Sequence, residues 1–216
     1  MRMRSLLAAV LVVAVSVSTA QAEEVCKDAA SCKACPIETA MKKLPAITYK
    51  VGTQDVCCEL SAEKLAKELK EPVIYVVGKE QLKDKSAALT HLVKATEKFV
   101  ADFATPHKCN VSGTTTIAGQ ELACSIAARE TTKLVKAAMD KIQLTYVVGD
   151  EKCQCPLQAA SLAKASGKAT RYEVAGKTSS CALSSRLSLA QAKYKAAVQA
   201  LVKANAPKAK AAPAKS

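Results

Sequence analysis

Large aromatic side chains are scarce in this 216-residue chain, which has no Trp, two Phe and five Tyr. Because base stacking on aromatic rings is central to the binding of single-stranded nucleic acid, the shortage argues against sequence-specific nucleic-acid recognition. It also predicts a core of small aliphatic side chains, each of which buries little area. A core of that kind is stabilised weakly, so covalent crosslinks would help it.

Motifs of common enzymes are also missing. The chain has no Gly-rich phosphate loop, no Gly-x-Ser-x-Gly elbow and no His-Glu-x-x-His sequence. The only histidines are His91, in a helical pattern, and His107, in a loop, so neither is a good ligand or base. These absences favour a protein without enzymatic activity.

The first residues follow the three-part pattern of a secretory signal. Arg2 and Arg4 precede an apolar run over 6–17, and Ala20-Gln21-Ala22 supplies small residues for cleavage. The pattern predicts removal of 1–22, an exported protein in the periplasm or outside the cell, and no transmembrane segment thereafter. The alternative is an uncleaved N-terminal anchor.

Lysine dominates the charge, and the formal net charge is +13. Residues 205–216 contain only Asn, Ala, Pro, Lys and Ser, a composition that predicts a disordered basic tail. We expect salt-sensitive contact with an anionic cell-envelope polymer or membrane surface. The alternative is that lysine only keeps the protein soluble. The lysines assigned to anionic contact are Lys203, Lys208, Lys210 and Lys215.

An internal repeat organises the middle of the chain. Residues 48–77 and 145–174, at an offset of 97, are identical at 12 of 30 positions, including scarce Tyr and Cys. A Tyr-x-Val-Gly strand ending occurs in four versions, each following a predicted helix. The repeat-defining residues are Tyr49, Gly52, Tyr75, Gly78, Tyr146, Gly149, Tyr172 and Gly176.

These signals predict an α/β fold from two helix-strand-helix-strand-helix halves. Within each half, two strands joined by a helix would form a parallel pair. Since a two-stranded sheet is unstable alone, the halves would pair into one four-stranded mixed sheet with pseudo-twofold symmetry. The predicted boundaries are a signal peptide at 1–22, a first half with a loose N-terminus at 23–104, a connector at 105–120, a second half at 121–204 and a tail at 205–216.

Cysteine is abundant, with ten residues that all follow position 22. Most are predicted just after a strand, at the start of the next helix, and helix segments begin near Cys35, Cys58, Cys124 and Cys155. At a helix start the dipole favours the thiolate. Beside Cys26, the candidates for disulfides or metal ligands are Cys32, Cys35, Cys57, Cys58, Cys109, Cys124, Cys153, Cys155 and Cys181.

Three roles remain open for these thiols. An even number in an oxidising compartment first indicates structural disulfides, of unspecified connectivity. Thiolate pairs such as Cys57-Cys58 and Cys153-Gln-Cys155 would also suit zinc or copper(I). Cys32-Lys-Ala-Cys35 has the spacing of a redox pair, which would make the protein a thiol oxidoreductase, although no strand precedes it.

Two fragments, Tyr-x-Val-Gly…Cys-Cys at 49–58 and Cys109-Asn-Val-Ser-Gly113, resemble pieces of the YHS/TRASH-type metal-associated modules. Those modules carry a Cys near a Ser/Gly turn and a later Cys-Cys-x-x-Cys. Here Ser61 replaces the last Cys, and Cys153-Gln-Cys155 shifts the pair. Most of the chain also resembles uncharacterised exported bacterial proteins with the same duplicated pattern, a resemblance that implies no known activity.

The leading expectation is therefore an exported, disulfide-stabilised, non-catalytic protein of the cell envelope that contacts anionic surfaces and needs no cofactor. A soft-metal-binding protein is the alternative, and a thiol oxidoreductase is the third.

Overall fold

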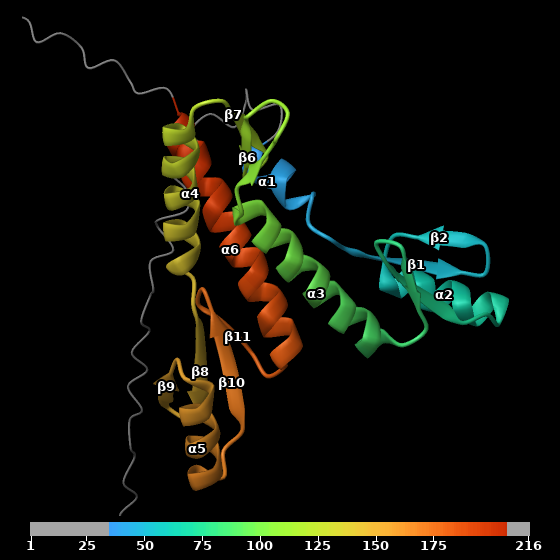
Figure 1. The fold of residues 1–216 in the computed structure, drawn as a ribbon. Coiled ribbons are helices and arrows are strands. Elements are labelled where there is room, and N and C mark those ends of the chain that lie inside the picture. Colours follow the sequence, from blue (N-terminus) through green and yellow to red (C-terminus); the bar gives the residue numbers. More distant parts are fainter. Residues whose placement is uncertain (1–34, 207–216) are drawn as a thin grey trace, which may run out of the picture. The chain divides into compact units, whose positions relative to one another are not determined.

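The structure, a computed structural model, describes residues 35–206 (Figure 1). The predicted signal peptide, Cys26, Cys32, Lys208, Lys210 and Lys215 lie outside the described residues. Within 35–206 the chain is a mixed α/β protein. Its helices are α1 (Pro36–Met41), α2 (Glu59–Leu69), α3 (Lys85–Ala104), α4 (Ser125–Asp140), α5 (Pro156–Ser166) and α6 (Ala182–Asn205). Its strands are β1 (Ile47–Val51), β2 (Gln54–Val56), β3 (Val73–Val77), β4 (Glu80–Leu82), β5 (His107–Lys108), β6 (Thr115–Ile117), β7 (Gln120–Leu122), β8 (Leu144–Val148), β9 (Glu151–Cys153), β10 (Thr170–Val174) and β11 (Lys177–Ser179).

One local arrangement occurs five times, and we call it the hairpin–helix unit. It consists of a strand, a two-residue turn, a short antiparallel return strand and a helix. The first residue of the helix always comes seven positions after the first turn residue, as in Gly52 and Glu59. The units are β1–β2–α2, β3–β4–α3, β6–β7–α4, β8–β9–α5 and β10–β11–α6.

Positive backbone φ angles explain the residues at the turns. Gly52, Gly78 and Gly149 open three turns with φ of 58°, 61° and 62°, the pattern of a type II′ hairpin. In the other two turns both residues have positive φ, as in Ala175 and Gly176 with 47° and 79°, the pattern of type I′. Both turn types match the twist of antiparallel strands, so each makes the chain double back at once.

Two buried positions join the hairpin of each unit to its helix. The residue before the turn is always β-branched, and the fourth helical residue is always small. Each of these side chains is at most 5% exposed, so the strand and the first helical turn pack closely. The strand residues are Val51, Val77, Ile117, Val148 and Val174, and the helix residues are Ala62, Ala88, Ala128, Ala159 and Ser185.

The sheets are antiparallel, and this corrects the predicted mixed sheet with parallel strand pairs. One four-stranded sheet has the order β2-β1-β3-β4, another has the order β11-β10-β8-β9, and β5-β6-β7 form a third sheet. Every strand pair found within 35–206 is antiparallel. The physical reason is the return strand of three residues, which was not among the predicted strands. It reverses the chain once more before the helix, so β3 runs opposite to β1.

Each four-stranded sheet therefore forms within one predicted half, rather than from strands of both halves. The cross-strand register places Tyr49 opposite Tyr75 and Tyr146 opposite Tyr172, at the centre of the two paired strands. The predicted connector at 105–120 contains β5 and β6, and β7 begins at its last residue.

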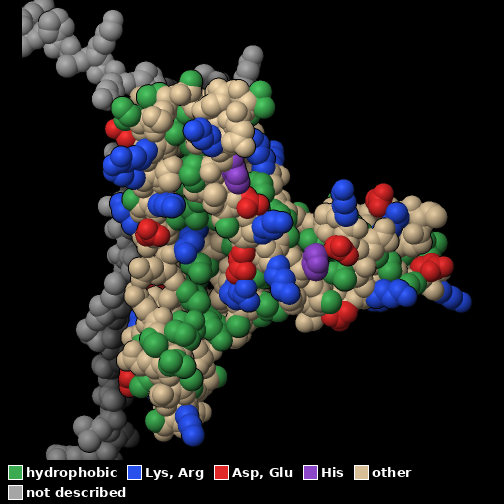
Figure 2. Space-filling model, in the orientation of Figure 1, with side chains coloured by type: hydrophobic (Ala, Val, Ile, Leu, Met, Phe, Trp, Pro, Cys, Tyr) green, Lys and Arg blue, Asp and Glu red, His purple; other side chains and the backbone are tan. Residues whose placement is uncertain are grey.

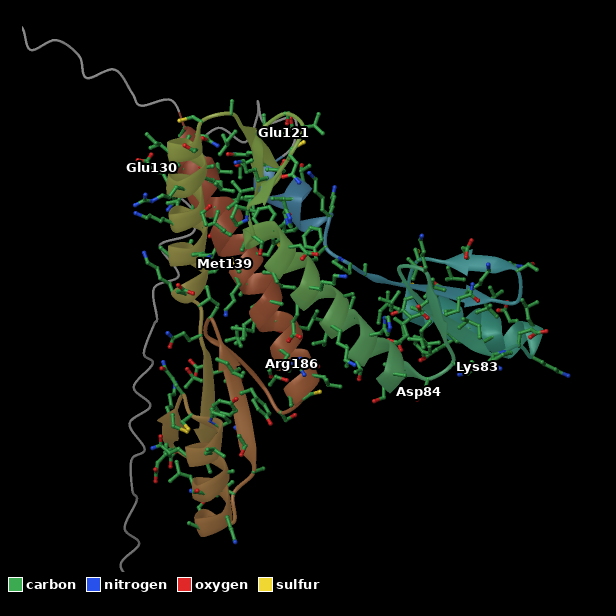
Figure 3. The ribbon with its side chains drawn as sticks, viewed as in Figure 1. Lys83, Asp84, Glu121, Glu130, Met139 and Arg186 are labelled. Carbon is green, nitrogen blue, oxygen red and sulfur yellow. The ribbon has the colours of Figure 1, made fainter. Side chains whose placement is uncertain are left out.

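The long helices α3, α4 and α6 carry the main aliphatic core, since α6 packs against α1, α3 and α4. Tyr194 of α6 is 2% exposed, and its ring makes edge contacts with Phe99 and Phe103 at 5.4 and 4.8 Å between centroids. Its hydroxyl donates a hydrogen bond to the carbonyl oxygen of Ala40. Arg186 of α6, labelled in Figure 3, also forms a two-point ion pair with Glu97 of α3, at 2.9 and 2.7 Å. None of the helices within 35–206 is both long enough and apolar enough to cross a membrane.

We expect Gly78→Ala to lower the free energy of unfolding by about 1 kcal/mol, because alanine is strained at positive φ. A Cβ atom at Gly78 would meet no other atom within 4 Å, so the loss reports backbone strain alone. Ala175→Gly is the reverse control and should raise stability by a similar amount, because Ala175 already has a φ of 47°. Urea unfolding measures both, and equal stability of all three proteins would contradict this description of the turns.

Candidate functional site

Exposed thiols occupy the N-cap position of four of the five hairpin–helix units. The N-cap is the residue just before the first helical residue, and here it is Cys58, Cys124, Cys155 and Cys181. All four are exposed, and their backbone angles are extended, as an N-cap requires. The predicted placement of cysteines between a strand and a helix start is confirmed at these positions.

The fifth unit shows what a stabilising cap looks like in the same fold. Asp84 precedes α3, and its carboxylate accepts a hydrogen bond of 2.7 Å from the backbone N–H of Ala87. None of the four cysteine caps makes a side-chain capping hydrogen bond. Since Asp, Asn or Ser at this position stabilises a helix by about 1 kcal/mol relative to a non-capping residue, cysteine is a poor choice for stability. The thiols therefore call for a chemical explanation.

A serine three residues after the cysteine favours the thiolate at three places. The Cys58 thiol donates to Ser61 Oγ at 3.0 Å, and the Ser61 side chain lowers the pKa of Cys58. Ser184 likewise lowers the pKa of Cys181, and Ser112 lowers that of Cys109. A hydroxyl can donate to the thiolate once it forms, which favours the charged state. The repeated Cys-x-x-Ser spacing is visible in the sequence but was missed there.

Cys58 has the most elaborate surroundings of these cysteines. The neighbouring Cys57 is also exposed and adds a smaller lowering of the Cys58 pKa. The next residue, Glu59, forms an ion pair of 2.6 Å with Lys85, the first residue of α3. This point of the fold therefore places two adjacent thiols at the start of α2, where the macrodipole favours negative charge.

The remaining cysteines differ in exposure. Cys153 is 8% exposed and packs with Val148 and Ala159, and its thiol donates weakly to the carbonyl oxygen of Cys155 at 3.7 Å. Cys35 is half-buried just before α1. The structure therefore separates the predicted Cys153-Gln-Cys155 pair into one thiol in the core and one at the surface.

The described residues contain no disulfide, and all eight cysteines of 35–206 are free thiols. Within the same range no three Cys, His, Asp or Glu side chains come together as a metal site. In a sheet with the predicted parallel strand pairs, the strand ends that precede the helices would lie along one edge and bring these cysteines together. The strands are antiparallel, so that reason for gathering does not hold. Disulfide pairing stays a prediction.

The repeated tyrosines pack in cross-strand pairs. The rings of Tyr49 and Tyr75 lie 5.7 Å apart at 67°, and those of Tyr146 and Tyr172 lie 5.7 Å apart at 62°. Edge contacts of this kind stabilise a sheet. Burial is the largest cause of the raised pKa of Tyr49. The repeated Tyr and Gly residues thus belong to the sheets and turns. Of the four lysines assigned to anionic contact, Lys203 lies within α6, where its side chain is exposed.

We expect Cys124→Asp to raise the free energy of unfolding by about 1 kcal/mol, because a carboxylate there can accept a backbone hydrogen bond as Asp84 does. Cys124→Ala should be nearly neutral, since the thiol makes no capping bond. Urea unfolding measures both. A loss of stability in Cys124→Ala as large as the gain expected for Asp would show that the thiol does cap the helix.

Ser184→Ala should move the pH midpoint for alkylation of Cys181 upward, because the hydroxyl that lowers its pKa is removed. At neutral pH the variant thiol should therefore react more slowly with iodoacetamide. Ser188→Ala, an exposed serine one turn further along α6, is the matched control. Rates are read for the Cys181 peptide by mass spectrometry, and identical pH profiles for the three proteins would refute the role of Ser184.

Comparison with known proteins identifies no family, since no family model, curated protein or solved structure matches this chain. The function is therefore inferred from its thiols, their hydrogen bonds and the charges around them.

Proposed function

We propose that this chain is an exported protein that binds soft metal ions, copper(I) foremost, through exposed thiolates at helix starts. The observation that carries the proposal is the cysteine at four of five N-caps, where it is exposed and makes no capping bond. Asp84 performs the stabilising role in the same position of the same unit. A residue that is poor for stability and repeated at one geometric position fits a chemical role.

The chemistry of the position suits a soft cation. A thiolate is the ligand form of cysteine, and it is favoured at a helix N-terminus by the dipole. Ser61 and Ser184 add a hydroxyl beside two of the four caps. Copper(I) and similar ions prefer thiolate over oxygen ligands. Four of the five units thus present one soft, exposed ligand at the helix start, and at two of them a serine hydroxyl also favours the thiolate.

Cys57 and Cys58 form the strongest individual site in this proposal. They offer two exposed thiols next to each other, whereas the other described N-cap cysteines have no directly adjacent cysteine. Copper(I) can be held by two thiolates, whereas structural zinc takes four ligands. The proposal therefore favours copper(I) over zinc at this pair.

The internal duplication and the resemblance to YHS/TRASH-type modules support the same proposal. We propose that the five units descend from one hairpin–helix ancestor whose cap was a metal-binding cysteine. In each four-stranded sheet two units meet with their tyrosines opposite each other, which suggests a twofold relation within each half. Export rests on the signal pattern of 1–22 alone.

A disulfide-stabilised, non-catalytic envelope protein is the second candidate. The observation that favours it is the core, in which most buried hydrophobic residues are Val or Ala. Small side chains bury little area, so crosslinks between the ten cysteines would add stability that the core lacks. A thiol oxidoreductase centred on Cys32 and Cys35 stays a prediction, because Cys32 lies outside the described residues.

Copper(I) competition titration of the reduced protein tests the first proposal. The wild type should take copper(I) from a chelator, and Cys57→Ser/Cys58→Ser should lose the tightest binding step because both ligands are removed. Cys109→Ser is the matched control, since it removes one exposed thiol with a lowered pKa but leaves the adjacent pair intact. Unchanged tight binding in the double variant would refute Cys57–Cys58 as the site, and no binding by the wild type would refute the function.

A further inference from the structure

Helix α4 exposes a row of cations that take part in none of the ion pairs found within 35–206. Arg129, Lys133 and Lys136 are exposed, and they line a hollow of about 380 Å³ together with Pro106, Ala128 and Thr132. No acidic residue lines this hollow. Figure 2 shows Lys and Arg side chains gathered over α4.

The surroundings of the row are basic as well. Pro106 leads directly into His107 and Lys108, both exposed in β5. Glu130 is the only acidic residue of α4 before Asp140, and it is not among the residues that line the hollow (Figure 3). By contrast, the lysines of α2 alternate with Glu63 and Glu68. Three cations therefore share this side of α4 with one acidic residue, Asp140, which lies one turn beyond Lys136 at the end of the helix.

An exposed apolar side chain accompanies these cations. Ile126 is 66% exposed near the start of α4. With 3.6 residues per turn, Ile126, Arg129, Lys133 and Lys136 fall within an arc of about 80° on one side of the helix. A helix that lies on an anionic membrane surface carries Lys and Arg beside apolar side chains, and α4 offers three cations and one largely exposed apolar residue. The second helical residue is also exposed and apolar in α2 and α5, where Leu60 and Leu157 are 73% and 77% exposed, so it is the row of cations beside it that distinguishes α4.

We propose that this face of α4, defined by Ile126, Arg129, Lys133 and Lys136, docks on a membrane surface that contains anionic phospholipids. The guanidinium and the two ammonium groups pair with headgroup phosphates, and Ile126 enters the interfacial region. The proposal is independent of the metal-binding function, because it uses none of the thiols. It moves the anionic contact from the tail lysines to the folded part of the chain.

Co-sedimentation with vesicles tests this, using phosphatidylglycerol mixed equally with phosphatidylcholine, and phosphatidylcholine alone. The full chain should bind the mixed vesicles and not the neutral ones. Arg129→Gln/Lys133→Gln/Lys136→Gln should weaken binding about a hundredfold, since each cation near an anionic surface contributes a factor of about five. The matched control, Lys64→Gln/Lys67→Gln/Lys83→Gln, removes the same charge from exposed positions of α2 and of the segment between β4 and α3, and should weaken binding far less.

Ile126→Ser separates a lipid surface from a soluble phosphate polymer. It should weaken vesicle binding severalfold and leave any binding of soluble polyphosphate unchanged, because only a membrane offers an apolar interior. Equal loss in the two triple variants would overturn the proposal in favour of a net-charge effect. Failure of the full chain to bind the mixed vesicles would also overturn it. So would polyphosphate binding as tight as vesicle binding, if Ile126→Ser changed neither. Circular dichroism and urea unfolding confirm that each variant is folded.

Discussion

The two-residue turn is the constraint on which the rest of the structure depends. It forces the chain to double back immediately, so each strand acquires a short antiparallel partner before the helix begins. The return strand has a constant length, and the helix therefore starts at a constant distance from the turn. The hairpin packs against the helix through two buried positions, which are the β-branched residue before the turn and the small fourth helical residue. An N-cap side chain is consequently presented in the same local setting five times.

At this N-cap position, the residue that best stabilises the helix differs from the residue that can act as a soft-metal ligand. Asp84 uses the position to satisfy a backbone N–H group, as the physics of helix ends favours. The four cysteines leave that group without a side-chain partner and place an exposed thiol there instead, and at Cys58 and Cys181 a serine hydroxyl lowers the pKa of the thiol. Cys124, Cys155 and Cys181 are therefore ligand candidates as well, although none of them has an adjacent cysteine.

Much of the local structure could be predicted from the sequence, because Tyr-x-Val-Gly marks strand ends and the cysteines mark helix starts. The sheet topology could not. The return strands are three residues long, and segments such as Gln54–Val56 carry too little β-propensity to be recognised. Without the return strands, consecutive long strands are expected to run in the same direction, which is why the predicted mixed sheet contained parallel strand pairs. The N-cap role of Asp84 could not be predicted for a related reason. Only when all five turns are aligned does Asp84 occupy the position at which the other units have cysteine.

The most direct test of the account is the oxidation state of the cysteines after export to an oxidising compartment. The protein would be alkylated without reductant, digested and mapped by mass spectrometry. The account predicts that Cys57, Cys58, Cys124, Cys155 and Cys181 are alkylated, and that copper(I) added first protects Cys57 and Cys58. If all ten cysteines are instead found in disulfides, the thiols are crosslinks, and the metal-binding account is wrong.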